Sequence, residues 1–273
     1  MLIQRVMTAL VLIPLLLAAV WWLPPAGLYL VFCAAGLVAM WEWAGMMGPA
    51  AAAPAGRAGV VAICALGMGL AWYGREATVW ALLASGAWWL YALYLLRAYA
   101  REPETTRLSP ASMLLIGLLL IVPTMLALWL LRAMPDGALR VLFLFFLVFA
   151  ADTGAYFAGR RFGRHKLAPA ISPGKTVEGL IGGLALSAVW TLLAGPWVFG
   201  TGSALQLLGL LLLSLIVAGF SVVGDLSESL FKRIAGLKDS GQILPGHGGM
   251  LDRVDSIVAA APMMALGLTL LRL

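Results

Sequence analysis

Long apolar windows follow one another along almost the whole chain and are separated by short polar segments. Nine of these windows approach the roughly 20 residues that an α-helix needs to cross a bilayer. They cover residues 3–23, 26–47, 58–73, 78–96, 111–131, 139–158, 177–199, 204–224 and 254–271. Residues 58–73 form the weakest window, because it is short and contains glycine, so eight spans are the alternative. The pattern predicts an all-α, polytopic integral membrane protein.

The composition excludes a soluble domain. Hydrophobic residues make up 63% of the 273 residues, charged residues make up only 11%, and the mean hydropathy is +0.99. The first window resembles a signal peptide, but it has no small-residue cleavage site and ends in Trp21 and Trp22, which are typical of a membrane interface. We therefore interpret it as a membrane helix. Cys33 and Cys64 lie in separate apolar windows and are interpreted as buried hydrophobic residues.

The basic residues are distributed unevenly between the two ends of the predicted spans. If the N-terminus lies inside, fourteen of the 18 Lys and Arg residues fall on the inner side and four on the outer side. Basic residues favour the cytoplasmic side of a membrane, so this bias predicts a cytoplasmic N-terminus and cytoplasmic charged segments. We attribute the net charge of +6 to contact with anionic lipid headgroups, and not with nucleic acid.

One acidic residue lies within an N-terminal window. Glu42, in the run Met40-Trp41-Glu42-Trp43, is near the predicted cytoplasmic end of the second window. A carboxylate inside a membrane is a functional candidate by default. Near the interface, however, a charge costs much less, so we slightly favour a structural role for this side chain.

The densest charge in the chain lies between Ser221 and Ser256. The first part of this segment predicts a helix from Ser221 to Leu237, because apolar residues recur at helical spacing on one face. These residues are Leu226, Leu230, Ile234 and Leu237. The opposite face carries Asp225, Glu228, Ser229 and Lys232, with Arg233 at its boundary. We expect this helix at the membrane edge, with its charges toward water or a cleft.

A glycine-rich loop follows the predicted helix. In Pro245-Gly246-His247-Gly248-Gly249, the proline and glycines favour a bent backbone whose N–H groups can approach phosphate oxygens closely. Asp252, Asp255 and Ser256 then share a helical spacing where the last window begins. Mg²⁺ is usually held by one or two carboxylates, with water and phosphate oxygens completing its shell. The pattern is therefore typical of a metal-assisted polyphosphate site.

A second charged segment extends from Asp152 to Glu178. Asp152 lies in the last third of an apolar window, which is costly unless the carboxylate meets a cation, a metal ion or water. A basic cluster at residues 159–166 would attract phosphate, although membrane topology alone explains it equally well. The run Ser172-Pro173-Gly174-Lys175-Thr176 has the small residues, lysine and hydroxyl group of a phosphate loop, without the spacing of a Walker motif.

Together these segments resemble a known enzyme family. The similar residues are Ser229, Lys232-Arg233, Lys238-Asp239, the Pro-Gly-His-Gly-Gly run and Asp252-Arg253-Val254-Asp255. In type and spacing they resemble the signature of the phosphatidate cytidylyltransferases, also called CDP-diacylglycerol synthases. The runs from Asp152 to Tyr156 and from Ser172 to Gly179 are similar to further segments of that family. The resemblance covers roughly the C-terminal half of the chain.

The resemblance implies an enzyme that joins CTP and phosphatidate, using Mg²⁺, to give CDP-diacylglycerol and pyrophosphate. It assigns metal binding to Asp225 and Asp252, with Asp152, Asp239 and Asp255 as weaker candidates. The implied catalytic residues are Asp225, Asp252, Lys232, Arg233, Lys238 and Asp239. The implied substrate and phosphate contacts are Ser172, Lys175, Thr176, Ser229, His247, Gly248, Gly249 and Arg253. We expect His247 on a loop that closes on the nucleotide, and His165 outside the site.

We expect two regions in the chain. Residues 1–137 would form about five N-terminal membrane helices, and residues 138–273 would form about four helices with the catalytic cytoplasmic loops. The resemblance further implies a homodimer. The many spans and small cytoplasmic face favour a bacterial inner membrane.

Two other functions remain open from the sequence. A CTP-dependent kinase of a polyprenol or another membrane lipid would need similar groups and a base, and would release CDP instead of pyrophosphate. An anion transporter could use Asp152 and Glu42 within the membrane. Transporters usually show interrupted helices in two halves, whereas the charge here is concentrated between Asp152 and Asp255.

Overall fold

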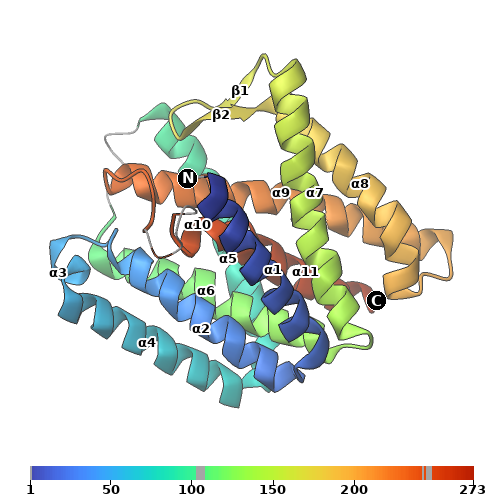
Figure 1. The fold of residues 1–273 in the computed structure, drawn as a ribbon, viewed down its shortest axis with the longest axis horizontal. Coiled ribbons are helices and arrows are strands. Elements are labelled where there is room, and N and C mark those ends of the chain that lie inside the picture. Colours follow the sequence, from blue (N-terminus) through green and yellow to red (C-terminus); the bar gives the residue numbers. More distant parts are fainter. Residues whose placement is uncertain (1, 103–107, 242, 244–247) are drawn as a thin grey trace.

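The computed structural model describes residues 2–102, 108–241, 243 and 248–273, with side chains from Leu10 onward. Among these described residues, eight helices are long and apolar enough to span a membrane (Figure 1). The prediction of an all-α, polytopic membrane protein is therefore confirmed.

The elements follow one another in a simple order. The N-terminal helices are α1 (Leu2–Trp22), α2 (Pro25–Ala44), α3 (Pro49–Ala52), α4 (Pro54–Tyr73), the short 3-10 helix η1 (Arg75–Ala77), α5 (Thr78–Arg101) and α6 (Pro110–Ala133). The C-terminal elements are α7 (Gly137–Phe162), β1 (Lys166–Ala168), β2 (Ser172–Thr176), α8 (Val177–Phe199), α9 (Ala204–Ile234), α10 (Leu251–Val254) and α11 (Ile257–Leu271).

Eight of the nine predicted windows correspond to the eight candidate spans. The weakest window, residues 58–73, belongs to α4, which has 20 residues because Pro54 at its first turn starts the helix earlier. The first window forms α1, whose described apolar part, Leu10–Trp22, is shorter than the eight spans. Cys33 and Cys64 are buried and free, as predicted.

Helix α9 joins two predicted segments into one. The apolar window 204–224 and the charged helix predicted from Ser221 to Leu237 form a continuous helix of 31 residues. The predicted C-terminal end is wrong by three residues. Gly236 takes a left-handed conformation with φ of +70°, and the Leu237 N–H donates to the Lys232 carbonyl oxygen at 2.8 Å, which ends the helix. Leu237 therefore lies beyond the helix and is 39% exposed.

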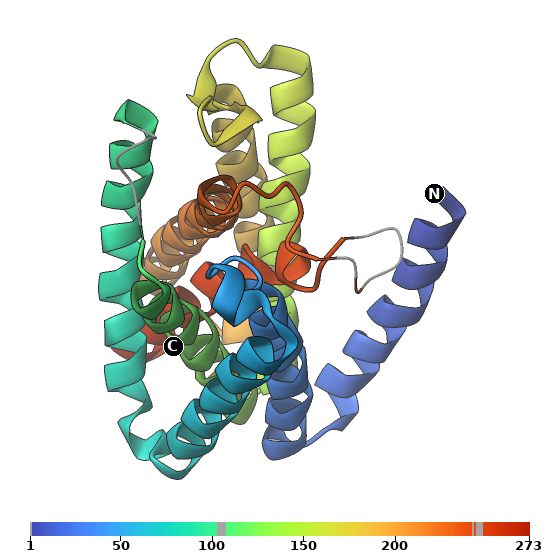
Figure 2. The ribbon, with the colours of Figure 1, turned by 90° about the vertical axis from the view of Figure 1, so that its left-hand side faces the viewer.

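A two-stranded antiparallel hairpin, β1 and β2, connects α7 to α8 and lies at one end of these helices (Figures 1 and 2). The two helices pack closely against each other. A Cβ atom on Gly183 of α8 would lie only 2.6 Å from the carbonyl oxygen of Ala151 of α7, so glycine allows this approach. The packing places Asp152, the next residue of α7, beside the residues that begin α8.

Helix ends that were predicted to share the outer side of the membrane lie together. Arg132, at the end of α6, donates to the carbonyl oxygen of Leu23 at 2.9 Å. Arg140, near the start of α7, donates to the carbonyl oxygen of Leu273 at 2.8 Å. These contacts agree with the alternation of helix directions that nine successive apolar segments require.

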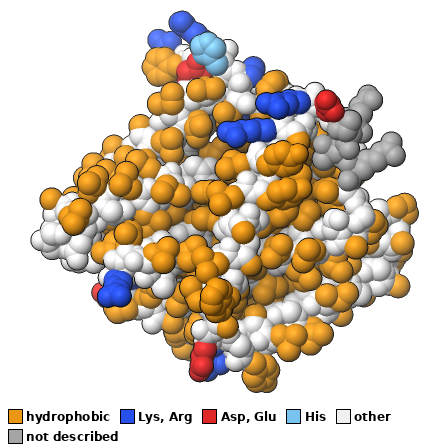
Figure 3. Space-filling view, turned by 180° about the vertical axis from the view of Figure 1, so that it is seen from behind, with side chains coloured by type: hydrophobic (Ala, Val, Ile, Leu, Met, Phe, Trp, Pro, Cys, Tyr) orange, Lys and Arg blue, Asp and Glu red, His pale blue; other side chains and the backbone are white. Residues whose placement is uncertain are grey.

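Hydrophobic side chains cover the surface as well as the interior. Trp43, Trp89 and Phe143 are almost completely buried, yet Leu30 is 69% exposed and Trp197 is 74% exposed. Figure 3 shows hydrophobic side chains across the middle of one face, with Lys, Arg, Asp and Glu toward its edges. Soluble proteins rarely expose such extended apolar surface, so this surface is suited to lipid.

Candidate active site

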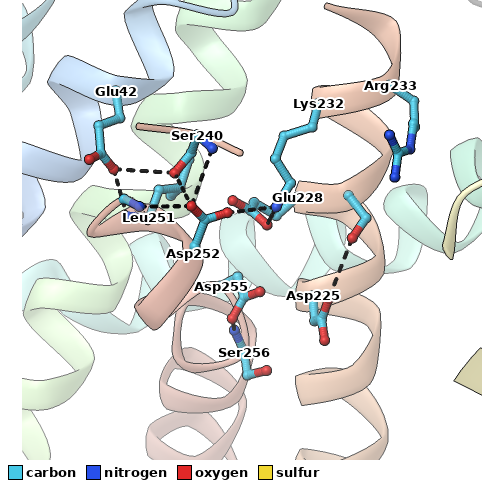
Figure 4. Close-up of polar contacts among 12 residues, drawn as sticks. Glu42, Asp225, Glu228, Lys232, Arg233, Ser240, Leu251, Asp252, Asp255 and Ser256 are labelled. Atoms are coloured by element: carbon cyan, nitrogen blue, oxygen red, sulfur yellow. Dashed lines mark hydrogen bonds and ion pairs between the residues drawn. The ribbon is translucent and has the colours of Figure 1, made fainter. Parts of the chain in front are cut away.

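Charged side chains gather on two sides of α9, toward its C-terminal end. On one side, Asp225 lines a pocket between α9, α7, α8 and the hairpin. On the other side, Lys232 contacts both Glu228 of α9 and Asp252 of α10. Figure 4 shows Asp225 of the first group and Glu228 and Lys232 of the second on the same stretch of α9. We call them the pocket and the Asp252 cluster, the latter consisting of Glu228, Lys232, Ser240 and Asp252.

The pocket has a volume of about 470 Å³. Its charged and hydroxyl-bearing lining residues are Asp152, Tyr156, Arg160, Lys175, Thr176 and Asp225. The remaining lining is glycine and aliphatic side chains, including Leu167, Leu180 and Val222. Charges of both signs beside aliphatic walls suit a ligand that carries phosphate groups as well as hydrocarbon.

Asp225 is contacted from two directions. The Lys175 Nζ atom lies 2.6 Å from Asp225 Oδ2, and the Ser229 hydroxyl donates to Asp225 Oδ1 at 3.5 Å. Asp225 is also close enough to Asp152 and Asp255 for the carboxylates to interact electrostatically, and Lys175 acts on both. Lys175 therefore lies near three acidic side chains, of which it contacts Asp225 directly.

Local sequence explains how Lys175 reaches α9. The Thr176 hydroxyl accepts the Gly179 N–H at 3.1 Å and so caps the N-terminus of α8. Arg233 of α9 donates to the carbonyl oxygen of Ile171, between the two strands, at 3.3 Å. These two contacts hold the hairpin over the pocket and direct Lys175 toward Asp225.

In the Asp252 cluster, one lysine contacts two carboxylates. Lys232 Nζ lies 2.5 Å from Glu228 Oε2 and 2.7 Å from Asp252 Oδ1. The other oxygen of Asp252, Oδ2, accepts the Ser240 N–H at 3.2 Å, the Ser240 hydroxyl at 2.9 Å and the Gly249 N–H at 2.9 Å (Figure 4). Asp252 thus connects α9 to the segment between α9 and α10.

Gly224 allows α9 to contact the start of the last span. A Cβ atom at this position would clash with the carbonyl oxygen of Asp255 and would lie 3.1 Å from the Cβ of Ala259. Since Asp225 follows Gly224 directly, this close approach brings the Asp225 and Asp255 carboxylates near each other. The segment 252–255 therefore connects the Asp252 cluster to the edge of the pocket.

The structure distributes the predicted residues between these two groups and the surface. Asp152, Lys175, Thr176 and Asp225 line the pocket, with Ser229 beside Asp225. Lys232, Asp252 and Gly249 belong to or contact the Asp252 cluster. Lys238, Asp239 and Arg253 are exposed, while Ser172, Gly248 and Asp255 are half-buried. His247 lies outside the described residues. His165 is exposed, pairs with Glu178 at 2.6 Å and is not among the residues that line the pocket.

Several predicted phosphate contacts have partners within the chain. The Gly249 N–H donates to Asp252, the Thr176 hydroxyl caps α8, and Lys232 is held between two carboxylates. Gly248 has a φ of +81°, which confirms the expected bent backbone at this position. These residues therefore shape the site in addition to any contact with a substrate.

Sequence reasoning missed other members of the site. Glu228 was placed on the charged face but given no role, although its spacing of four residues from Lys232 is typical of an ion pair on a helix. Tyr156 and Arg160 belonged to segments that the sequence analysis singled out but were not named as site residues; they line the pocket one and two helical turns after Asp152. Ser240 lies in a segment without periodicity, and no local pattern marks it.

The donor groups in the pocket fit a hard divalent cation. Among the residues that the structure describes, no three His, Cys, Asp or Glu side chains are grouped as a complete metal site. Asp152 and Asp225 nevertheless line the same pocket. Two carboxylates suffice for Mg²⁺ when water and the phosphates of a substrate complete its shell. The site is therefore suited to a cation that binds together with a polyphosphate.

The polytopic helical fold and the pocket lined by carboxylates and a lysine are features that a membrane-embedded enzyme acting on phosphate groups requires. A model of the cytidylyltransferase family matches residues 3–271. The chain therefore belongs to the cytidylyltransferase family, and it is a nucleotidyltransferase.

Named relatives agree with this assignment along the chain. It is 41% identical to the phosphatidate cytidylyltransferase of Pseudomonas aeruginosa over 267 residues, which cover 97% of this chain and 96% of the relative. It is 36% identical to the enzyme of that name from Haemophilus influenzae over 286 residues, covering 97% and 98% of the two chains. A shorter match of 129 residues, 50% identical, relates it to the phosphatidate cytidylyltransferase of Staphylococcus saprophyticus and covers 47% of this chain and 48% of the relative.

Proposed function

We propose that this protein transfers the cytidylyl group of CTP to phosphatidate, giving CDP-diacylglycerol and pyrophosphate for phospholipid synthesis. The observation that carries the proposal is the pocket in which Lys175 contacts Asp225 beside Asp152. It occurs in a chain that matches phosphatidate cytidylyltransferases over 97% of its length. The pocket offers charged groups for phosphates and an aliphatic wall for the lipid.

The reaction requires little covalent chemistry from the protein. The phosphate monoester of phosphatidate has a second pKa of about 6, so it is largely a dianion at neutral pH and needs no strong base. One of its oxygens forms a bond to the α-phosphorus of CTP, and the bond from that phosphorus to the bridging oxygen of the β-phosphate breaks. Catalysis therefore consists of aligning two anions that repel each other and neutralising the charge on the departing pyrophosphate.

Side chains of the pocket can supply this alignment and neutralisation. Lys175 and Arg160 both line the pocket and carry the positive charge that phosphate groups need. Lys175 contacts Asp225 at 2.6 Å, which directs its ammonium group into the pocket. We propose that Lys175 exchanges this carboxylate for a phosphate oxygen of the bound nucleotide.

We propose that Asp225, together with Asp152, holds Mg²⁺ when CTP binds. The ion would neutralise charge on the phosphates and help to orient them. Asp255 is close enough to Asp225 for the two acidic side chains to interact electrostatically. Asp252 is paired with Lys232 and bonded to Ser240, so we propose that it acts mainly by shaping the site.

We further propose that the site faces the cytoplasm of a bacterium, at the inner membrane, where CTP is present. The bias of basic residues and the bacterial relatives support this orientation. Association into a homodimer stays a prediction.

Identification of the released nucleotide product tests the proposal. Purified protein in detergent is supplied with CTP, phosphatidate and Mg²⁺, and pyrophosphate and CDP are measured separately. Cytidylyl transfer releases pyrophosphate in a one-to-one ratio with lipid product. Release of CDP would instead identify a lipid kinase and contradict the proposal, and the absence of any lipid-dependent product would also contradict it.

A further inference from the structure

Glu42 of α2 reaches the segment between α9 and α10 from the N-terminal half of the chain (Figure 4). Its side chain is buried, with only 2% of the residue exposed. The Oε2 atom accepts the Leu251 N–H at 2.8 Å and the Ser240 hydroxyl at 3.3 Å. Burying a carboxylate costs free energy unless it is hydrogen-bonded, so these two hydrogen bonds indicate a defined role for Glu42.

The surrounding backbone leaves room for this carboxylate. A Cβ atom on Gly241 would lie 2.5 Å from Glu42 Oε1, and a Cβ atom on Gly249 would lie 2.5 Å from Glu42 Oε2. Any larger residue at either position would displace the Glu42 side chain. The two glycines and Glu42 therefore fit together as one unit, although they come from opposite halves of the chain.

The two bonds of Glu42 join the ends of one segment. Ser240 precedes the glycine-rich stretch, and Leu251 is the first residue of α10. Ser240 also donates from its N–H and its hydroxyl group to Asp252 Oδ2. Glu42 thus fixes both sides of the stretch and, through Ser240, the carboxylate of Asp252.

We propose that Glu42 is a positioning residue for the reaction: it holds Ser240 and Leu251 in place and thereby orients Asp252 and, three residues later, Asp255 against α9. This inference rests on the proposed function for its catalytic readout. It assigns a task to an N-terminal residue outside the charged segments of the C-terminal half. Glu42 acts through Ser240 and Leu251, and it does not line the pocket.

Three variants separate positioning from bulk stability. Glu42→Gln keeps the shape and one carbonyl acceptor, and Glu42→Ala removes both acceptors. Glu76→Ala is the matched control, because Glu76 is exposed on η1, where the chain is predicted to face the other side of the membrane. Residues that orient catalytic groups typically contribute about 10- to 100-fold to activity. We expect kcat to fall in this range for Glu42→Ala and less for Glu42→Gln, with a smaller change in the KM for CTP and a Tm close to that of Glu76→Ala.

A readout that does not depend on the reaction tests the geometry directly. Hydrogen exchange, measured by mass spectrometry on the whole protein in detergent, reports opening of residues 248–256. We expect faster exchange there in Glu42→Gln than in wild type or Glu76→Ala, with α4 unchanged. Unchanged exchange would overturn the positioning role, whatever the reaction proves to be. Failure of wild type to make CDP-diacylglycerol would contradict the proposed function. The exchange result would still show whether Glu42 holds residues 248–256 in place.

A double-mutant cycle with Ser240→Ala measures whether Glu42 acts through Ser240. If Glu42 acts through Ser240, the loss of kcat in the double variant is clearly smaller than the product of the two single losses. Independent losses would overturn the connection. A fall in Tm that accounts for the whole loss of kcat in Glu42→Gln, or faster exchange with unchanged kcat and KM, would also overturn the proposal.

Discussion

The Nζ atom of Lys175 lies 2.6 Å from the Oδ2 atom of Asp225, although the two residues belong to different elements, β2 and α9. This contact places a lysine from the hairpin and a carboxylate from a membrane span in one pocket. The side chains are 23% and 32% exposed, so water screens the pair and its contribution to stability is small. We therefore attribute the Lys175–Asp225 pair to the binding of phosphate groups in the pocket, and not to stabilisation of the fold.

Replacement of Lys175 by Gln should therefore affect activity far more than stability. Loss of a group that stabilises developing charge costs about 100-fold in kcat or more. We expect a loss of that size for Lys175→Gln, with a Tm within about 2 °C of wild type, since exposed ion pairs contribute only about 1 kcal/mol or less. The control is Lys166→Gln, on the same hairpin but outside the pocket. Equal activities of the two variants would contradict the role of Lys175.

Replacement of Lys232 by Met should, in contrast, lower the stability of the protein strongly. Lys232 is 12% exposed and separates the carboxylates of Glu228, 5% exposed, and Asp252, 12% exposed. Removing one partner of a buried ion pair costs about 3 kcal/mol or more, because the remaining charges are buried without compensation. We expect a clear fall in Tm in detergent, together with loss of activity. Lys166→Met, at an exposed position, should leave Tm unchanged. A Lys232→Met protein with the Tm of wild type would show that the cluster does not stabilise the fold.

Close packing between α7 and α8 predicts a specific effect of glycine replacement. Gly183→Val would force a side chain against the carbonyl oxygen of Ala151, where a Cβ atom would lie at 2.6 Å. Overpacking of this kind costs about 1–3 kcal/mol and would shift Asp152 relative to Lys175. We expect lower Tm and lower activity. The control is Gly69→Val in α4, since no atom lies within 4 Å of a Cβ there. Similar Tm values for the two variants would contradict the close contact.

Removal of divalent metal tests the proposed use of the pocket carboxylates. We expect EDTA to abolish activity and added Mg²⁺ to restore it. Asp225→Asn should require a higher Mg²⁺ concentration for half-maximal activity, because it removes one of two proposed ligands. Asp136→Asn serves as the control, since Asp136 precedes α7 at the end away from the pocket. Full activity in EDTA, or an unchanged Mg²⁺ requirement in Asp225→Asn, would contradict this part of the mechanism.

The membrane helices could be predicted from the sequence because bilayer thickness sets a length that apolar windows must reach. The windows identified seven helices and the combined span 251–271, including the weak window in α4. The end of the charged helix was harder to predict. Leu237 continues the apolar spacing, yet the left-handed conformation of Gly236 ends the helix before it.

The candidate site could be predicted as a set of residue types but not as an arrangement. Spacing placed Asp225, Glu228 and Lys232 on one helix, and the structure agrees. Spacing could not show that Asp225 contacts Lys175 while Lys232 contacts Asp252, because these pairs join α9 to β2 and to α10, which are distant in the sequence. Resemblance supplied the candidate residues, and tertiary packing divided them between the pocket and the Asp252 cluster.

The role of Glu42 could not be predicted from the sequence either. Its position near the end of an apolar window identified it as unusual but did not distinguish a functional role from a structural one. The deciding contacts, with Ser240 and Leu251, come from the far end of the chain. Local periodicity contains no information on such partners. The structure alone supplies them.

The most direct test of the central claim follows the phosphates of CTP into lipid. Wild type, Asp225→Asn and the control Asp136→Asn are incubated with phosphatidate, Mg²⁺ and CTP labelled at either the α- or the γ-phosphate. We predict that the α label enters lipid with wild type and Asp136→Asn, that the γ label leaves as pyrophosphate, and that Asp225→Asn transfers much less label at the Mg²⁺ concentration that is half-saturating for wild type. Entry of the γ label into lipid, or full transfer by Asp225→Asn, would contradict cytidylyl transfer at this pocket.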